Sequence, residues 1–145
     1  MKRPQVRDSD SSCGIFGIVD LKGGLISGDL VARALNAMAP RYNGLGAGFA
    51  AYGVYPHLKD YYALHVIIDD EDAKQRFEDY INQRVNVVRD EPIPTRKVAG
   101  VRDPPILWRY FVEVLEGALA EEGVTEDDYI ANLVFSVNEG IEGAY

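Results

Sequence analysis

The spacing of apolar residues along the chain predicts three helices. In the first, Ser27 can cap the amino end and Pro40 stops the carboxyl end. Asp69-Asp70-Glu71 opens the second, and Thr125 caps the third, whose first turn is acidic. The apolar stripes are Leu30, Val31, Ala34, Leu35 and Met38; Ala73, Phe77, Tyr80, Ile81 and the stem of Arg84; and Ile130, Leu133, Val134, Val137 and Ile141.

Shorter apolar runs, bounded by turn residues, predict strands. They cover residues 14–20, 49–54, 61–68, 85–88 and 106–114. Alternation of Trp108, Tyr110, Val112 and Val114 favours a strand in the last run, although a helix is the alternative. The proline-rich stretch 90–105 predicts an irregular loop, and residues 142–145 begin another extended segment. The mixture predicts an α+β fold.

Composition limits the kinds of protein to consider. With 145 residues, 47% of them hydrophobic, the chain is expected to form one domain or a large piece of one. Its formal net charge of −8 argues against binding to nucleic acid or to an anionic membrane surface. The leader lacks the apolar stretch of a secretory signal, and no apolar run is long enough to span a membrane. We therefore expect a cytoplasmic protein.

Cys13 is the residue with the clearest chemical potential. It is the chain's single cysteine, which excludes an intramolecular disulfide and a cysteine-rich zinc site. A solitary cysteine is most often a small buried apolar residue. Here, however, it stands at an abrupt boundary between the polar leader 1–12 and the apolar run that starts at Gly14. Cleavage after Ser12 would make Cys13 the first residue.

An amino-terminal cysteine carries its own base. The freed α-amino group has a pKa of about 7.7–8.0 and can take the thiol proton without a histidine. This mechanism suits a chain with only two histidines, His57 and His65. The pattern therefore predicts a nucleophile that is uncovered by processing.

A glycine-rich loop, residues 41–48, joins the first helix to the strand predicted at 49–54. It lacks the Lys-Ser/Thr pair of a phosphate-binding loop and the spacing of a dinucleotide fingerprint, so nucleotide binding is rejected. Two interpretations remain open: a tight turn, or backbone held close to a substrate.

The run Cys13-Gly14-Ile15-Phe16-Gly17-Ile18 resembles the start of mature class II glutamine amidotransferases, which have the amino-terminal-nucleophile hydrolase fold. The loop that starts at Arg41 is similar to the family's second signature, with Asn43 where an acidic residue is commoner. Within the family, residues 62–114 look most like the amidotransferase domain of archaeal-type glutamate synthase.

This resemblance implies an αββα sandwich over residues 13–145, with a small α+β insertion at about 60–115. It implies that Cys13 attacks glutamine, that Arg41 holds the surroundings of the nucleophile, and that Gly14 allows close approach of the backbone. Ammonia would pass to a synthase subunit or domain. Any flavin (FMN) or iron–sulfur cluster would belong to that partner, and none is expected in this chain.

The family's oxyanion-hole and substrate-gripping residues lie further downstream than this sequence reaches. Asn138-Glu139-Gly140 does not replace the family's Asn-Gly pair, because a glutamate interrupts it on a predicted helix. We therefore expect a fragment or a split gene product that is inactive alone. Two alternatives remain: a non-catalytic assembly subunit that keeps its leader, and a truncated remnant completed by a neighbouring chain.

Other candidates have simpler explanations. The acidic run 69–72 could bind a hard cation, but acidic residues at a helix start need only the helix dipole. His65 is expected to be packed on its strand and His57 to lie in a loop. Trp108, Tyr110 and Phe111 are expected to fill the core. Solvated charge is the simpler explanation for four basic residues, Arg96, Lys97, Arg102 and Arg109, although contact with a partner is the alternative.

Overall fold

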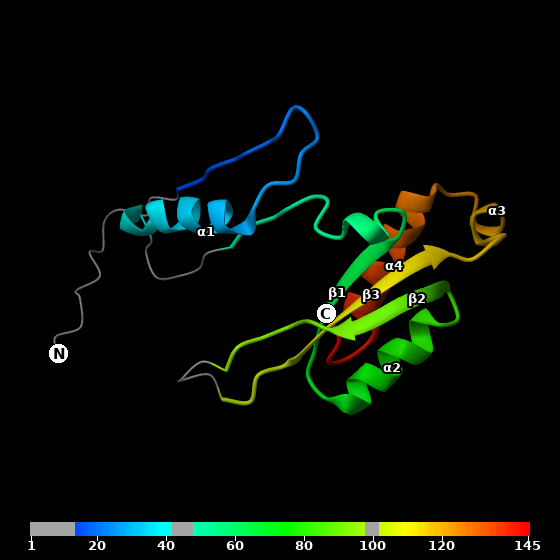
Figure 1. Cartoon of the computed structure of the whole chain (residues 1–145). Helices are drawn as coiled ribbons and strands as arrows, with labels where there is room; N and C mark the ends of the chain where they lie inside the picture. Colours follow the sequence, from blue (N-terminus) through cyan, green and yellow to red (C-terminus); the bar gives the residue numbers. More distant parts are fainter. Residues whose placement is uncertain (1–13, 42–47, 98–101) are drawn as a thin grey trace. The chain divides into compact units, whose positions relative to one another are not determined.

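The computed structural model describes residues 14–41, 48–97 and 102–145. These residues divide into two compact units, one extending to Tyr52 and the other running from Gly53 to Tyr145 (Figure 1). The second unit is wider than the insertion expected at 60–115, because it also contains the carboxyl-terminal helix.

The first unit is built around one helix. Helix α1 spans Gly28–Ala37, and the Ser27 hydroxyl accepts a hydrogen bond from the backbone N–H of Asp29 at 3.3 Å, which confirms the predicted cap. A short 3-10 turn, η1, follows at Ala39–Arg41. It contains Pro40, so the α-helix ends where the sequence predicts.

The strands predicted at 14–20 and 49–54 are wrong in this structure. Both segments lack strand pairing, and apolar side chains along them are exposed: Ile15 is 94% exposed and Phe49 is 68% exposed. A strand needs a neighbour to satisfy its backbone hydrogen-bonding groups, and no described residue supplies one. These two segments therefore have the residue types of a strand, but no strand among the described residues pairs with them.

The second unit contains a three-stranded antiparallel sheet in the order β1-β3-β2. Its strands are β1 (Tyr62–Ile68), β2 (Val85–Pro92) and β3 (Ile106–Val114), which confirms three of the predicted strands and settles the last one against a helix. β2 is longer than predicted. After an irregularity between Val87 and Arg89 it continues pairing with β3 to Pro92, so the loop begins later than Asp90.

Two long helices accompany the sheet. Helix α2 (Glu71–Ile81) starts at Asp70, whose carboxylate accepts from the backbone N–H of Ala73 at 2.8 Å. Helix α4 (Glu126–Gly140) starts at Thr125, whose hydroxyl accepts from the N–H of Asp128. The predicted cap at Thr125 and the predicted start of the second helix at the acidic run are confirmed, and the structure identifies Asp70 as the residue that caps α2. The sequence did not predict the short helix α3 (Ala118–Glu122) or the 3-10 turn η2 (Pro56–Leu58), which contains His57.

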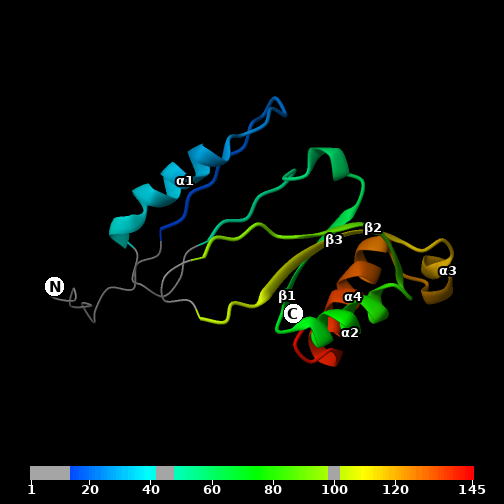
Figure 2. The ribbon, with the colours of Figure 1, turned by 60° about the horizontal axis from the view of Figure 1, so that its bottom comes forward.

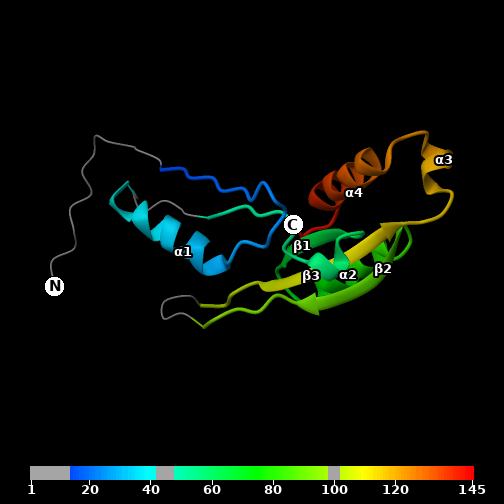
Figure 3. The ribbon, with the colours of Figure 1, turned by 45° about the horizontal axis from the view of Figure 1, so that its top comes forward.

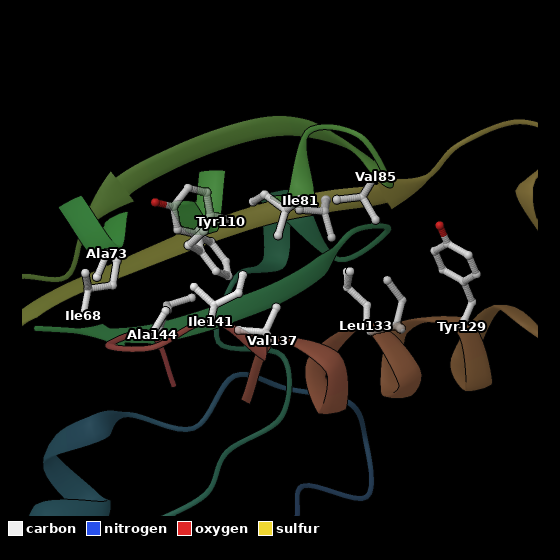
Figure 4. Packing of buried hydrophobic residues seen from close by; sticks show 14 residues of the cluster. Ile68, Ala73, Ile81, Val85, Tyr110, Tyr129, Leu133, Val137, Ile141 and Ala144 are labelled. Atoms are coloured by element: carbon white, nitrogen blue, oxygen red, sulfur yellow. The ribbon is translucent and has the colours of Figure 1, made fainter. Parts of the chain in front are cut away.

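Both long helices pack against one face of the sheet, and the core lies between them and the strands (Figures 2 and 4). At least half of the stripe predicted for α2 and of the stripe predicted for α4 is buried, but Val134 is 41% exposed. The core residues are Val66, Ile68, Ala73, Phe77, Ile81, Val85, Tyr110, Val112, Tyr129, Ile130, Leu133, Val137, Ile141 and Ala144.

The predicted aromatic core is largely confirmed, on both faces of β3. Tyr110 and Phe111 are each 1% exposed, but only Tyr110 belongs to the cluster beneath the helices. Trp108 is half-buried at the edge of that cluster, and its indole N–H donates to Asp90 at 2.9 Å. The unit is therefore α+β, with its main core on one face of the sheet.

The last residues return to the sheet (Figure 3). Gly143 has a positive φ of 83°, which glycine adopts without the strain that a side chain adds. The chain then pairs with β1: Ala144 lies opposite Ile68 in an antiparallel bridge, and Tyr145 exchanges two backbone hydrogen bonds with Ile67, each 2.9 Å long. The predicted extended segment at 142–145 is thus present at its end.

Candidate functional site

The amino-terminal segment and the end of α1 meet at Gly14. A Cβ added to Gly14 would stand 2.7 Å from the Met38 sulfur and 3.3 Å from Cδ of Arg41, so the backbone at Gly14 lies directly against both side chains. Only glycine permits this approach without displacement of a neighbour. The contact joins the residue after Cys13 to the first residue of the glycine-rich loop.

The sequence around Pro40 explains how Arg41 reaches this position. Met38 closes α1 in a helical conformation, and its carbonyl accepts a hydrogen bond from the N–H of Arg41 at 2.8 Å. Pro40 cannot donate the bond that would continue the α-helix. The chain therefore tightens into the 3-10 turn η1, which carries the aliphatic stem of Arg41 to Gly14.

Two parts of the candidate site lie outside the described residues. These are Cys13 with its leader, and residues 42–47 of the glycine-rich loop. Cys13 is joined to Gly14 by a single peptide bond, so the Gly14 contact is the described feature nearest to the candidate nucleophile. The roles predicted for Cys13, Gly14 and Arg41 stay predictions.

The first unit buries little of its own apolar surface. No residue of α1 is buried, and Leu21 and Leu25 are 92% and 83% exposed. Exposed apolar side chains of this size normally mark a surface that another element covers. The Gly14 contact is thus set in a unit whose apolar residues remain available for packing.

A second group of polar side chains crosses the sheet of the other unit, on the face away from α2 and α4. His65 on β1 and Glu91 on β2 both lie opposite Arg109 on β3. The Arg109 guanidinium donates to Glu91 (Nε to Oε1, 2.7 Å), and Tyr55 lies over the row, its hydroxyl 2.6 Å from Nε2 of His65. We call these four residues the polar row.

The polar row corrects two predictions. His65 is exposed and hydrogen-bonded, not packed in a core, and Arg109 is an ion-paired residue, not a solvated one. Hydrogen bonds from Arg89, and then from Arg109, lower the pKa of Glu91 below its usual value. Sequence periodicity could place His65 and Arg109 on the sheet, but no sequence signal identifies Tyr55 as their partner.

Tyr55 gives this row a structural role. Its ring meets Phe111 edge to face, with the ring centroids 4.9 Å apart, and its hydroxyl accepts a hydrogen bond from Arg109 at 3.3 Å. These contacts hold the segment before β1 against the sheet and cover Phe111. The row thereby explains a buried aromatic residue outside the helix-covered core.

The described residues contain no group of three or more His, Cys, Asp or Glu side chains arranged to hold a metal ion. Within the acidic run 69–72, Asp70 caps α2 and Glu71 and Asp72 lie in its first turn. The helix accounts for these three carboxylates. In the same described part of the chain, no helix is long and apolar enough to cross a membrane.

Comparison with known proteins gives one informative relative. A protein of Archaeoglobus fulgidus, described as uncharacterized, is 43% identical over 147 residues, which cover 99% of this chain and 39% of the relative. The chain therefore spans about two fifths of that protein's length. No family model matches the chain, and no solved structure matches it.

Proposed function

We propose that this chain carries the nucleophile of a class II glutamine amidotransferase, a glutaminase that supplies ammonia to a glutamate-synthase-type partner. One observation carries the proposal: the backbone of Gly14 lies against the side chain of Arg41. The resemblance rests on two separate signatures, the Cys13 run and the Arg41 loop. Their contact in space is what a shared site requires.

The proposed chemistry needs no other side chain for proton transfer. Removal of residues 1–12 frees the α-amino group of Cys13, which accepts the thiol proton. The thiolate attacks the side-chain carboxamide of glutamine, and collapse of the tetrahedral intermediate breaks the carbon–nitrogen bond. Ammonia leaves with the proton that the amine returns. Water then hydrolyses the γ-glutamyl thioester to glutamate and restores the thiol.

The αββα sandwich forms part of the proposal. Residues 14–20 and 49–54 have strand-like sequences, and each leaves large apolar side chains exposed, among them Val19 (75%) and Val54 (55%). A second polypeptide segment that pairs with them would satisfy their backbone groups and cover these side chains. In this proposal they become strands when the amidotransferase domain is complete.

We assign substrate binding and stabilisation of the oxyanion to the polypeptide that completes the amidotransferase domain. Asn138, Glu139 and Gly140 all lie within or at the end of α4, so they do not form a loop with donors aimed at a substrate. The loss of one oxyanion donor raises a barrier by roughly 2.7–4 kcal/mol. The proposal therefore places turnover in the assembly of this chain with its partner.

Two linked measurements test the proposal on the chain isolated with its natural partners. Intact mass should show loss of residues 1–12. A diazo-ketone analogue of glutamine should then add once to the chain, and the chain's single cysteine makes the position of the label unambiguous. The Cys13→Ser variant is the matched control and should remain unlabelled by the analogue at residue 13.

The outcomes separate glutaminase activity from the alternative of a non-catalytic assembly subunit. A leader that persists in the isolated assembly supports the assembly role. A processed chain whose Cys13 does not react with the analogue overturns the catalytic proposal. If excess glutamine protects Cys13 from labelling, but an amino acid without a side-chain amide does not, the result supports a glutamine site.

A further inference from the structure

The outer edge of β1 is only partly occupied. In the sheet order β1-β3-β2, one side of β1 pairs with β3 and the other side is an edge. Tyr145 exchanges two backbone hydrogen bonds with Ile67 on this edge, and the N–H of Asp69 donates to the carbonyl of Gly143 at 2.9 Å. Residues 143–145 thus begin a fourth, antiparallel strand.

Within the described residues, the remainder of this edge has backbone groups without a partner. Alternate residues of an antiparallel strand direct their N–H and C=O groups to opposite sides. Since the backbone N–H and C=O groups of Ile67 face outward, those of Ala63 and His65 do so too. Outside the β1–β3 ladder, no backbone hydrogen bond from the described residues reaches either of them. An unpaired edge of this kind is a template for another strand.

Helix α4 provides an apolar side chain above the same edge. Asp127 and Val134 are seven residues apart and therefore lie along one stripe of the helix, which ends at Gly140, just before Ile141. Asp127 accepts a hydrogen bond from the hydroxyl of Tyr62 on β1, and Ile141 is buried next to the returning segment. Val134 is 41% exposed and, by its spacing from Asp127, lies on the same flank of α4, the flank that contacts β1 through Tyr62.

The opposite flank of α4 is already covered. Tyr129 lies there, and its hydroxyl donates to the carbonyl of Arg84, which follows α2. The exposed apolar surface of Val134 therefore faces away from α2, toward the edge where a further strand would lie. The flank of α4 and the outer edge of β1 together form a position for one more strand, which residues 143–145 fill only in part.

We propose that this edge binds an extended segment of a polypeptide equivalent to the remaining three fifths of the A. fulgidus relative. The strand runs antiparallel to β1, in the direction set by Ala144 and Tyr145. It bonds to the backbones of His65 and Ala63, and it places apolar side chains opposite Val66 and Leu64, beneath Val134.

One observation favours this occupant over a second copy of the chain. The relative contains a long polypeptide outside the matched 39%, which can supply a continuous strand. Because Tyr145 already takes the position opposite Ile67, any added strand pairs with β1 only over residues 62–66, and the concentration dependence measured below separates a second copy from this occupant.

Amide hydrogen exchange tests the proposal directly. The chain is measured by NMR alone and with the unmatched region of the A. fulgidus relative, produced as a separate polypeptide. Exchange at Ala63 and His65 should slow at least about tenfold on addition, whereas Leu64 and Val66, which bond to β3, should change little. Unchanged exchange at both outward amides overturns the proposal. Slowing that depends only on the concentration of the chain itself also overturns it, because a second copy is then the occupant.

Edge variants make the test specific. Ala63→Pro removes one outward N–H while keeping the bonds to β3, so it should weaken the complex at least about tenfold; Ala63→Ser is the matched control and should bind like the original chain. Val134→Asp, at an exposed position, should weaken the complex without unfolding the chain, which far-ultraviolet circular dichroism can verify. If both Val134→Asp and a folded Ala63→Pro bind normally, the proposed position is wrong.

Discussion

The backbone of Gly14 lies against the stem of Arg41, at a distance that leaves little room for a side chain. A Cβ at Gly14 would be 3.3 Å from Cδ of Arg41 and 2.7 Å from the sulfur of Met38. Gly14 follows Cys13 directly, and Arg41 opens the glycine-rich loop. The relationship links the two sequence signatures on which the proposed function depends.

Gly14→Ala should therefore impair the proposed site. The added methyl group must displace Met38 or Arg41, and a small shift of this kind moves the residue next to the nucleophile. We expect glutamine-dependent activity of the natural assembly to fall by about tenfold or more. The measurement is kcat/KM for glutamine, after intact mass has verified that the leader is removed.

Gly28→Ala is the control for this prediction. Gly28 begins α1 and has open space where a Cβ would be, so alanine should leave activity unchanged and slightly favour the helix. Equal activity in the Gly14→Ala variant and the unchanged assembly would show that the contact does not position the nucleophile.

Two adjacent isoleucines on β1 test the core. Ile68 is fully buried beneath the helices, whereas Ile67 lies on the other face and is 48% exposed. Ile68→Ala should lower the free energy of unfolding by about 2–5 kcal/mol. Ile67→Ala should lower it by no more than about 0.5 kcal/mol. Urea denaturation followed by circular dichroism measures both, and similar losses in the two variants would contradict the assignment of faces.

Helix caps and stripes were the part of the fold most accessible from the sequence. Ser27, Asp70 and Thr125 each bond to a backbone N–H one turn into the helix or less, which is a local interaction that the sequence encodes directly. Strand pairing is not local. The runs at 14–20 and 49–54 have strand character, but whether they pair depends on a partner segment that their own residues do not specify.

The hydrogen bond between Tyr62 and Asp127 predicts a pH dependence. The Asp127 carboxylate accepts a hydrogen bond from the Tyr62 hydroxyl at 2.6 Å, and this bond raises the pKa of Tyr62 to about 12. Because the folded pKa is above the unfolded value of about 10, this contribution to stability is complete below about pH 10 and is lost as the pH rises toward 12.

Tyr62→Phe isolates that contribution. The variant should be less stable by about 0.5–1.5 kcal/mol at pH 8, and the difference from the original chain should shrink between pH 10 and 12. Urea denaturation at pH 8, 10 and 11 measures it, and the difference removes the effect of the other tyrosines. A stability difference between the two chains that grows as the pH rises would contradict this prediction.

Gly143 should be necessary for the return of the chain to β1. Alanine there must adopt a positive φ, at a cost of roughly 1–2 kcal/mol, and its Cβ would lie 3.0 Å from that of Ala73. Gly143→Ala should destabilise the fold by about this amount and speed amide exchange at Ile67. Gly140→Ala, in open space at the end of α4, should be neutral or slightly stabilising. Unaltered exchange at Ile67 in Gly143→Ala would contradict the described pairing.

The candidate site was accessible from the sequence only in part. The Cys13 run and Arg41 are recognisable because their chemistry is carried by residue type and spacing. The contact of Gly14 with Met38 was not predictable, since it depends on how the 3-10 turn after α1 directs the chain. The same limit applies to the polar row, in which Tyr55 and Arg109 are 54 residues apart.

The most direct test of the account is the nitrogen source used by the Cys13→Ala assembly. Glutamate synthesis is measured in the natural assembly with glutamine and, separately, with ammonia. We predict that glutamine-dependent synthesis falls by more than about a thousandfold, because the nucleophile is gone, whereas ammonia-dependent synthesis is retained. Undiminished glutamine-dependent synthesis in this variant would contradict the assignment of Cys13 as the nucleophile.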